Sequence, residues 1–195
     1  GLLLAVLTNQ VRYEAVAKAT IFVPMAVSFT AAAVIWRFMY VFQPAGFEQI
    51  GVVNAFVTTL GFDPVPWITQ RSVNNYALIA AGVWMWTGFA LVVVSAGLKG
   101  ISSEIIEAAR VDGASETQIF WRIILPMLKP VLLVVSVTLI INSLKVFDLV
   151  YVMTFGNHDT DVLANLMFKE MFRFGNFGRA SAVEMLSKIV LTISS

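Results

Sequence analysis

The residues best suited to chemistry are a lone histidine with nearby acids and a few polar residues inside an apolar run. His158 is the one histidine of the chain, and Asp159 and Asp161 follow it. Imidazole and carboxylate groups can bind a metal ion, but no further ligands follow at the usual spacings. The chain lacks cysteine and the glycine-rich phosphate-binding loop of ATP hydrolases. We therefore predict no catalytic set, metal site or cofactor, and we interpret these three residues as a solvated loop.

A second group of polar residues interrupts the apolar run over 131–153. Asn142, Lys145 and Asp148 are spaced three apart, so in a helix they drift slowly around one side. Charged and polar groups at membrane depth normally face a bundle interior or a water-filled path. Two interpretations are open. Lys145 and Asp148 form a structural ion pair, or the group lines a substrate path together with Tyr151.

A charged stretch over residues 103–126 separates two long apolar runs and predicts two short helices joined by a glycine. Ser103 can cap the first helix, and Ser115 begins the second with the spacing of a capping box. Gly113 lies between them and can adopt the left-handed conformation that ends a helix. Pro126 is predicted to end the element, because it cannot donate the next backbone hydrogen bond.

The same stretch resembles the EAA loop of the membrane-spanning subunits of bacterial binding-protein-dependent ABC importers. The order and both spacings of that signature match without a gap, as do the flanking residues of the sugar-importer branch. The matching positions are Glu107, Ala108, Ala109, Asp112, Gly113, Ala114, Ile123, Leu125 and Pro126. In that family the loop is a coupling helix that docks on a cytoplasmic ATPase subunit, and we expect it within residues 99–129. An ordinary amphipathic helix pair on the membrane surface is the alternative interpretation.

Composition places the chain in a membrane. Of its 195 residues, 58% are hydrophobic and 13% are charged, whereas soluble domains carry roughly 25% charged residues. A net charge of +1 provides no basic face for nucleic acid. We predict an all-α, polytopic transmembrane helix bundle that forms a single domain over 1–195, and the resemblance implies that it is of the type I importer permease kind. We also expect this sequence to be a fragment that lacks N-terminal span(s) and the end of the last span.

Three apolar runs reach the length of about 20 residues that a bilayer span requires. They are residues 19–41, 76–98 and 131–153, and a short polar link over 8–18 precedes the first. Shorter helices are predicted near 52–60, near 163–172 and from 180 to 195. The first of these lies in a linker over 43–75 and is expected to be a surface or re-entrant helix.

The distribution of basic residues sets the orientation of these spans. Loops 8–18 and 99–129 together contain six Lys and Arg residues, and loops 43–75 and 154–179 contain four. Basic residues are enriched in cytoplasmic loops. The count therefore places the EAA-like loop in the cytoplasm, as the resemblance also implies.

The resemblance covers most of residues 1–182, including the stretch 144–154, and it implies a multi-pass permease subunit in the bacterial inner membrane. The family branch would be the sugar branch of the maltose, alpha-glucoside and glycerol-phosphate type, and the cargo would be an oligosaccharide or an alpha-glucoside-like sugar. The chain would not be an enzyme, because ATP would be hydrolysed by separate cytoplasmic ABC ATPase subunits. Other implied partners are a second, different permease subunit, a periplasmic or external sugar-binding protein and membrane lipid, with no nucleic acid. From the residues alone, a self-sufficient channel, a secondary transporter or a membrane-embedded enzyme is the alternative.

Overall fold

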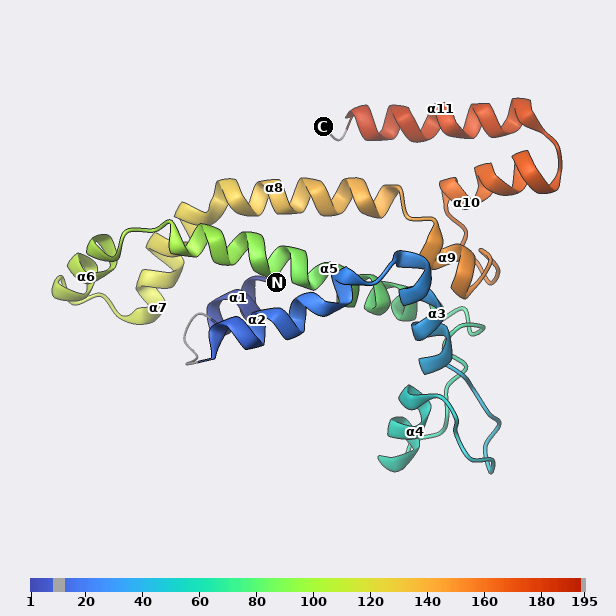
Figure 1. The fold of residues 1–195 in the computed structure, drawn as a ribbon, viewed down its shortest axis with the longest axis horizontal. Coiled ribbons are helices and arrows are strands. Elements are labelled where there is room, and N and C mark those ends of the chain that lie inside the picture. Colours follow the sequence, from blue (N-terminus) through green and yellow to red (C-terminus); the bar gives the residue numbers. More distant parts are fainter. Residues whose placement is uncertain (9–12, 194–195) are drawn as a thin grey trace. The chain divides into compact units, whose positions relative to one another are not determined.

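The computed structural model describes residues 1–8 and 13–193, and within these ranges every regular element is a helix (Figure 1). This confirms the predicted all-α class. The chain forms two compact units. Unit 1 consists of Gly1–Ala26 and Trp86–Ile140, and unit 2 consists of Val27–Met85 and Ile141–Ser195.

Unit 1 is built around the closely packed helices α5 and α8. Its elements are α1 (Leu2–Thr8), α2 (Glu14–Phe22), a 3-10 turn (Val23–Ala26), the second part of α5 (Asn74–Lys99), α6 (Ser103–Val111), α7 (Glu116–Ile119), a π turn (Phe120–Ile124) and most of α8 (Leu125–Leu144). Its core contains Ala5, Ala90, Val94, Leu128 and Val135. A Cβ at Gly97 would lie 2.9 Å from a methyl of Val131. The missing side chain therefore permits the close approach of the two helices, as small residues do in membrane bundles.

Among the described residues, two helices are long and apolar enough to cross a membrane: α5, with 26 residues, and the continuous helix Glu116–Leu144, with 29 residues. The first confirms the span predicted over 76–98. The second shows that the prediction for Pro126 was wrong, because the helix runs through it. The N–H of Leu125 bonds to the carbonyl of Phe120, five residues back, which defines the π turn. Local π turns re-satisfy backbone groups that a proline frees in a membrane helix.

The span predicted over 131–153 was also wrong in its boundaries. Helix α8 ends at Leu144, the backbone is non-helical from 145 to 147, and α9 (Asp148–Met153) then begins. Polar residues such as Lys145 mark the break, but similar residues also occur inside spans that face a bundle interior. Composition alone therefore could not reveal that the helix stops.

The first predicted span, residues 19–41, is bent by 99° between Glu14–Ala26 and Phe29–Met39, so it is not one straight helix. Pro24 lies in the 3-10 turn, where a proline removes a helical donor. The hydroxyl of Ser28 then accepts a hydrogen bond from the N–H of Ala31 and caps a new helix. The polar link predicted over 8–18 is helical from Glu14 onward, and its residues 9–12 lie outside the described residues.

Unit 2 contains several shorter helices. They are α3 (Phe29–Met39), α4 (Val52–Thr59), the first part of α5, α9, α10 (Leu163–Phe168), a π turn (Lys169–Arg173) and α11 (Phe177–Ile193). α3 packs against α9, and α10 packs against α11. The short helices predicted near 52–60 and 163–172 are confirmed. The last predicted helix begins at Phe177 instead of 180, and residues 194–195 lie outside the described range.

A buried asparagine organises the linker between α3 and α5. Asn54 is fully buried, and its amide group donates to the carbonyls of Val41 and Val65. Its carbonyl oxygen accepts from the N–H of Val65 and from the indole N–H of Trp67, each at 2.9 Å. One side chain thus joins the segments before and after α4 to that helix, so this part of the linker has a defined internal structure.

Candidate functional site

The EAA-like loop is a pair of helices with backbone hydrogen bonds at the joint between them. At the end of α6, the N–H of Ala114 bonds to the carbonyl of Ala109, and the N–H of Gly113 bonds to that of Arg110, both at 3.0 Å. This is the Schellman pattern, which requires a left-handed residue. Gly113 supplies it, with φ at 82°. The predicted left-handed conformation of this glycine is confirmed.

The starts of both helices are capped by serine. For α6 the cap is Ser102, whose hydroxyl accepts from the N–H of Glu104, so the prediction of Ser103 was wrong by one residue. For α7 the predicted capping box is present. The N–H of Ser115 donates to the Gln118 side chain at 2.9 Å, and the N–H of Gln118 donates back to the Ser115 hydroxyl at 3.4 Å.

An ion pair that sequence reasoning missed connects the two helices. The Nε of Arg110 donates to Oε1 of Glu116 at 2.7 Å, and the Nη2 of Arg110 donates to Oε2 of Glu116 at 3.2 Å. This two-pronged hydrogen bond raises the pKa of the Arg110 guanidinium above its ordinary value. Opposite charges six residues apart, on either side of a helix-ending glycine, are the signal that could have revealed it.

The surface of the loop combines exposed signature residues with exposed apolar side chains. Five of the matching positions are exposed: Glu107, Ala108, Asp112, Gly113 and Pro126. Val111 is 88% exposed and Trp121 is 62% exposed, whereas Ile119 is buried and anchors α7. Large apolar residues on an otherwise charged surface mark a contact surface for a partner or a membrane. The remaining matching positions, Ala109, Ala114, Ile123 and Leu125, are partly buried.

The polar residues expected to share one helix face lie on different elements. Asn142 is in the last turn of α8, Lys145 is in the break, and Asp148 is the first residue of α9. A carboxylate oxygen of Asp148 accepts a hydrogen bond from the hydroxyl of Thr30 at 2.8 Å. Lys145 is exposed and makes no ion pair with Asp148, although the structure describes both side chains. The hypothesis of an ion pair between them was wrong, because the helix ends between the two residues.

Lys145 and Tyr151 have separate surroundings within unit 2. Lys145 lines a groove of about 310 Å³ between the end of α8, α10 and α11. The other lining residues are Leu144, Leu163, Ala164, Met167, Val183, Glu184, Ser187 and Lys188. Tyr151 lies in an aromatic cluster, stacked on Phe147 at 5.0 Å and in contact with Phe155 and Phe168. Of the four residues predicted for a substrate path, Lys145 therefore lines this groove and Tyr151 belongs to the aromatic cluster.

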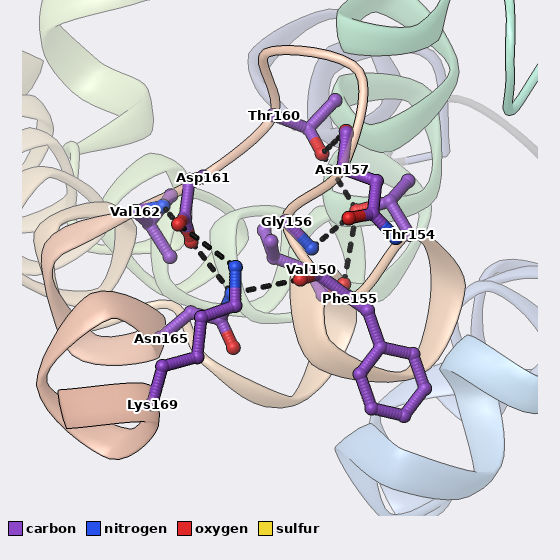
Figure 2. A network of polar contacts seen from close by, with 10 residues as sticks. All are labelled: Val150, Thr154, Phe155, Gly156, Asn157, Thr160, Asp161, Val162, Asn165 and Lys169. Carbon is purple, nitrogen blue, oxygen red and sulfur yellow. Dashed lines mark hydrogen bonds and ion pairs between the residues drawn. The ribbon is translucent and has the colours of Figure 1, made fainter. Parts of the chain in front are cut away.

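A polar network joins α9 to α10 through the turn that contains the lone histidine (Figure 2). The hydroxyls of Thr154 and Thr160 lie 2.7 Å apart. On the other side of the turn, Asp161 accepts from the amide of Asn165 at 2.6 Å and pairs with Lys169 at 2.9 Å. Figure 2 shows Asp161, Asn165 and Lys169 pointing toward one another. These contacts join the turn to the end of α9 on one side and to α10 on the other.

The backbone of this turn adopts an unusual conformation. Phe155, Gly156, His158 and Asp159 all have positive φ, between 57° and 71°. Asp159 pairs with Arg71 and Asp161 pairs with Lys169, so the two acids engage different cations. Within the described part of the chain, no group of three or more His, Asp or Glu residues could hold a metal ion.

The same turn gives information on topology. The amide of Asn74, at the start of α5, donates to the carbonyl of His158 at 2.7 Å. Asn74 begins one membrane-length helix, and His158 follows the other. The EAA-like loop lies at the opposite ends of both helices, since it joins the end of α5 to the start of Glu116–Leu144. The hydrogen bond between Asn74 and His158 thus joins two segments of unit 2 that are 84 residues apart in the sequence.

These features define a class: an α-helical membrane protein with two membrane-length helices connected by an exposed, capped helix pair. The sequence matches the family described as "Binding-protein-dependent transport system inner membrane component" over residues 1–195. The chain belongs to this family, and it is therefore a transport component of the inner membrane.

Individual relatives agree with this assignment. The chain is 57% identical over 191 residues to the osmoprotective compounds uptake permease protein GgtC of Synechocystis, covering 98% of this chain and 68% of that protein. It is 48% identical over 192 residues to the alpha-glucoside transport system permease protein AglF of Rhizobium meliloti, covering 98% of this chain and 57% of that protein. The chain thus spans little more than half to about two thirds of these relatives.

A solved structure shares the fold. A chain in the crystal structure of a bacterial alginate ABC transporter, in complex with an alginate pentasaccharide-bound periplasmic protein, superposes with a TM-score of 0.84 at 25% identity. The match covers 99% of this chain and 67% of that chain. It confirms the type I importer permease fold that the sequence predicted.

Proposed function

We propose that this chain is the translocation part of one permease subunit in an ABC importer for a sugar or a similar polyhydroxylated solute. The observation that carries the proposal is the exposed helix pair α6–α7, which has the family signature, complete caps and outward-facing apolar residues. The names of the relatives support the solute class, since they include permeases for alpha-glucosides and osmoprotective compounds.

The energy for transport comes from partner subunits. The sequence has no phosphate-binding loop, so ATP is hydrolysed by cytoplasmic ABC ATPase subunits that contact α6–α7. A second, different permease subunit completes the pathway in the membrane, and an external binding protein delivers the solute. Closure of the ATPases moves the helix pairs, and both units of this chain act as one transmembrane domain that switches between inward-facing and outward-facing states.

The solute path is proposed to include the polar residues near the break after α8. Asn142 is partly buried and carries both a donor and an acceptor, which suits the hydroxyl groups of a neutral sugar. Lys145 lines the groove between the end of α8, α10 and α11, and Tyr151 offers an aromatic face. Asp148 acts on this path through its hydrogen bond to Thr30, which positions α9 against α3.

Reconstituted transport tests the proposed function. The full-length permease is placed in proteoliposomes with its partner permease and ATPase, and uptake is measured with a panel of labelled saccharides. Uptake should require ATP, the ATPase and the loaded binding protein together. Uptake by the permease alone, driven by an ion gradient or by diffusion, would contradict the proposal and favour a secondary transporter or a channel.

A further inference from the structure

We propose that the ion pair between Arg110 and Glu116 sets the angle between α6 and α7, and thereby positions the surface that transmits ATPase motion. The inference rests on the proposed function of the loop. It adds two positioning residues that lie outside the set of matching signature positions.

Hydrogen bonding at the joint leaves one residue unconstrained. The Schellman bonds fix the backbone up to the N–H of Ala114, and the capping box fixes it from Ser115 onward. The torsions of Ala114 that separate these two motifs are not held by either one. Rotation there would change the angle between the helices without breaking a single backbone bond.

The ion pair restricts rotation about the backbone torsions of Ala114. Arg110 is in the last turn of α6 and Glu116 is the first residue of α7, so the bridge crosses directly over the joint. Two nitrogens meet two oxygens, at 2.7 and 3.2 Å, and this geometry fixes orientation as well as distance. A lysine at position 110 would provide a point charge without that orientation.

The angle matters because apolar contact residues lie on both sides of the joint. Val111 ends α6, and Trp121 follows α7. Their side chains are largely exposed, and their relative placement depends on the angle that the bridge holds. A partner that engages both residues can transmit a displacement only if the two helices move together.

Spin-label distances test the bridge independently of any partner. The chain has no cysteine, so labels attach only at introduced Glu104→Cys and Arg122→Cys, one on each side of the joint. We expect one narrow distance distribution in the unmodified loop, a broader one in Arg110→Glu and in Glu116→Arg, and a narrow one again in the double exchange. High salt should broaden the unmodified distribution, because it screens an exposed ion pair.

Matched controls separate the bridge from simple effects of charge. Thr117→Arg adds a positive charge beside the bridge and removes neither partner, so its distance distribution should stay narrow. Arg110→Gln with Glu116→Gln should give a broad distribution that no longer responds to salt. Unchanged distances in both single charge inversions would overturn the proposal.

Coupling is measured on the assembled transporter in nanodiscs, as ATPase activity stimulated by the loaded binding protein. Each inversion should lower stimulated turnover by about twofold to fivefold, the size expected of an exposed ion pair, and the exchange should restore it. Broadened distances with unchanged stimulation would also overturn the proposal. If no ATPase associates with the unmodified chain, the proposed function fails, while the distances still decide the bridge.

Discussion

Replacing Gly113 by alanine tests how much the left-handed conformation of the joint contributes to ATPase coupling. A Cβ at this position would meet no atom within 4 Å, so no steric clash is expected. The cost arises from the backbone, because φ is 82° and a residue with a side chain pays about 1–2 kcal/mol in the left-handed region. The alternative is to rotate the joint and lose the two Schellman bonds, each worth about 1 kcal/mol.

A free-energy change of this size corresponds to a factor of roughly 5 to 30 in the population of the native joint. We expect Gly113→Ala to insert into the membrane normally and to lower binding-protein-stimulated ATPase activity by up to that factor. Gly113→Val should lower the stimulated ATPase activity further. Gly113→Asn should retain most of this activity, because asparagine tolerates the left-handed region. The assay is ATP turnover of the purified complex in nanodiscs.

Gly61 provides the matched control. Its φ is 85°, and a Cβ there also meets no atom within 4 Å, but it follows α4 in the linker of unit 2. Gly61→Ala should therefore carry the same backbone strain and leave ATPase stimulation unchanged. The reasoning is refuted if Gly113→Ala couples normally, or if Gly61→Ala causes an equal loss of stimulation.

Three further predictions follow from unit 2 and from the topology. Lys145→Met and Asp148→Leu should have additive effects on thermal stability, because the two side chains lie on different elements and share no partner. Gly156→Ala should lower the melting temperature, because its Cβ would overlap the side chains of Asn165 and Asp161 and its φ is 71°. A cysteine at Ala114 should react with an impermeant reagent only from the cytoplasm, and a cysteine at Asn157 only from outside.

For each of these three predictions, one outcome would contradict the reasoning. A strong coupling energy between the Lys145 and Asp148 variants would restore the ion-pair hypothesis. Gly175 has a φ of 68° and open space around a Cβ, so a loss of stability in Gly175→Ala equal to that in Gly156→Ala would show that packing in the network is irrelevant. Labelling of both cysteines from one side would exclude an odd number of membrane crossings between them.

Local signals made the loop predictable. The capping box and the left-handed glycine depend on residues within a few positions of each other, so their sequence pattern determines their structure. The uncharged run that became α5 was likewise sufficient to predict a span. The ion pair between Arg110 and Glu116 could have been predicted in the same way, because its two residues are only six positions apart.

Helix boundaries and long-range contacts were not predictable in this way. Pro126 indicated an end, yet a π turn allowed the helix to continue. The run over 131–153 is mostly apolar and was predicted as one span, yet the helix breaks at Lys145. The partner of Asp148 is Thr30, 118 residues away, and no periodicity connects them. Such contacts depend on how helices pack, which a single sequence does not encode in a local pattern.

The most direct test of the central claim is a photo-crosslink from the exposed end of α6. A photoreactive residue is placed at Val111, and matched probes are placed at Phe47 and Phe172 in unit 2, which are 69% and 71% exposed. In membranes containing the assembled transporter, the probe at Val111 should form an adduct with the ATPase subunit, and the two others should not. Absence of that adduct, or equal adducts from all three positions, would contradict the assignment of α6–α7 as the contact with the ATPase.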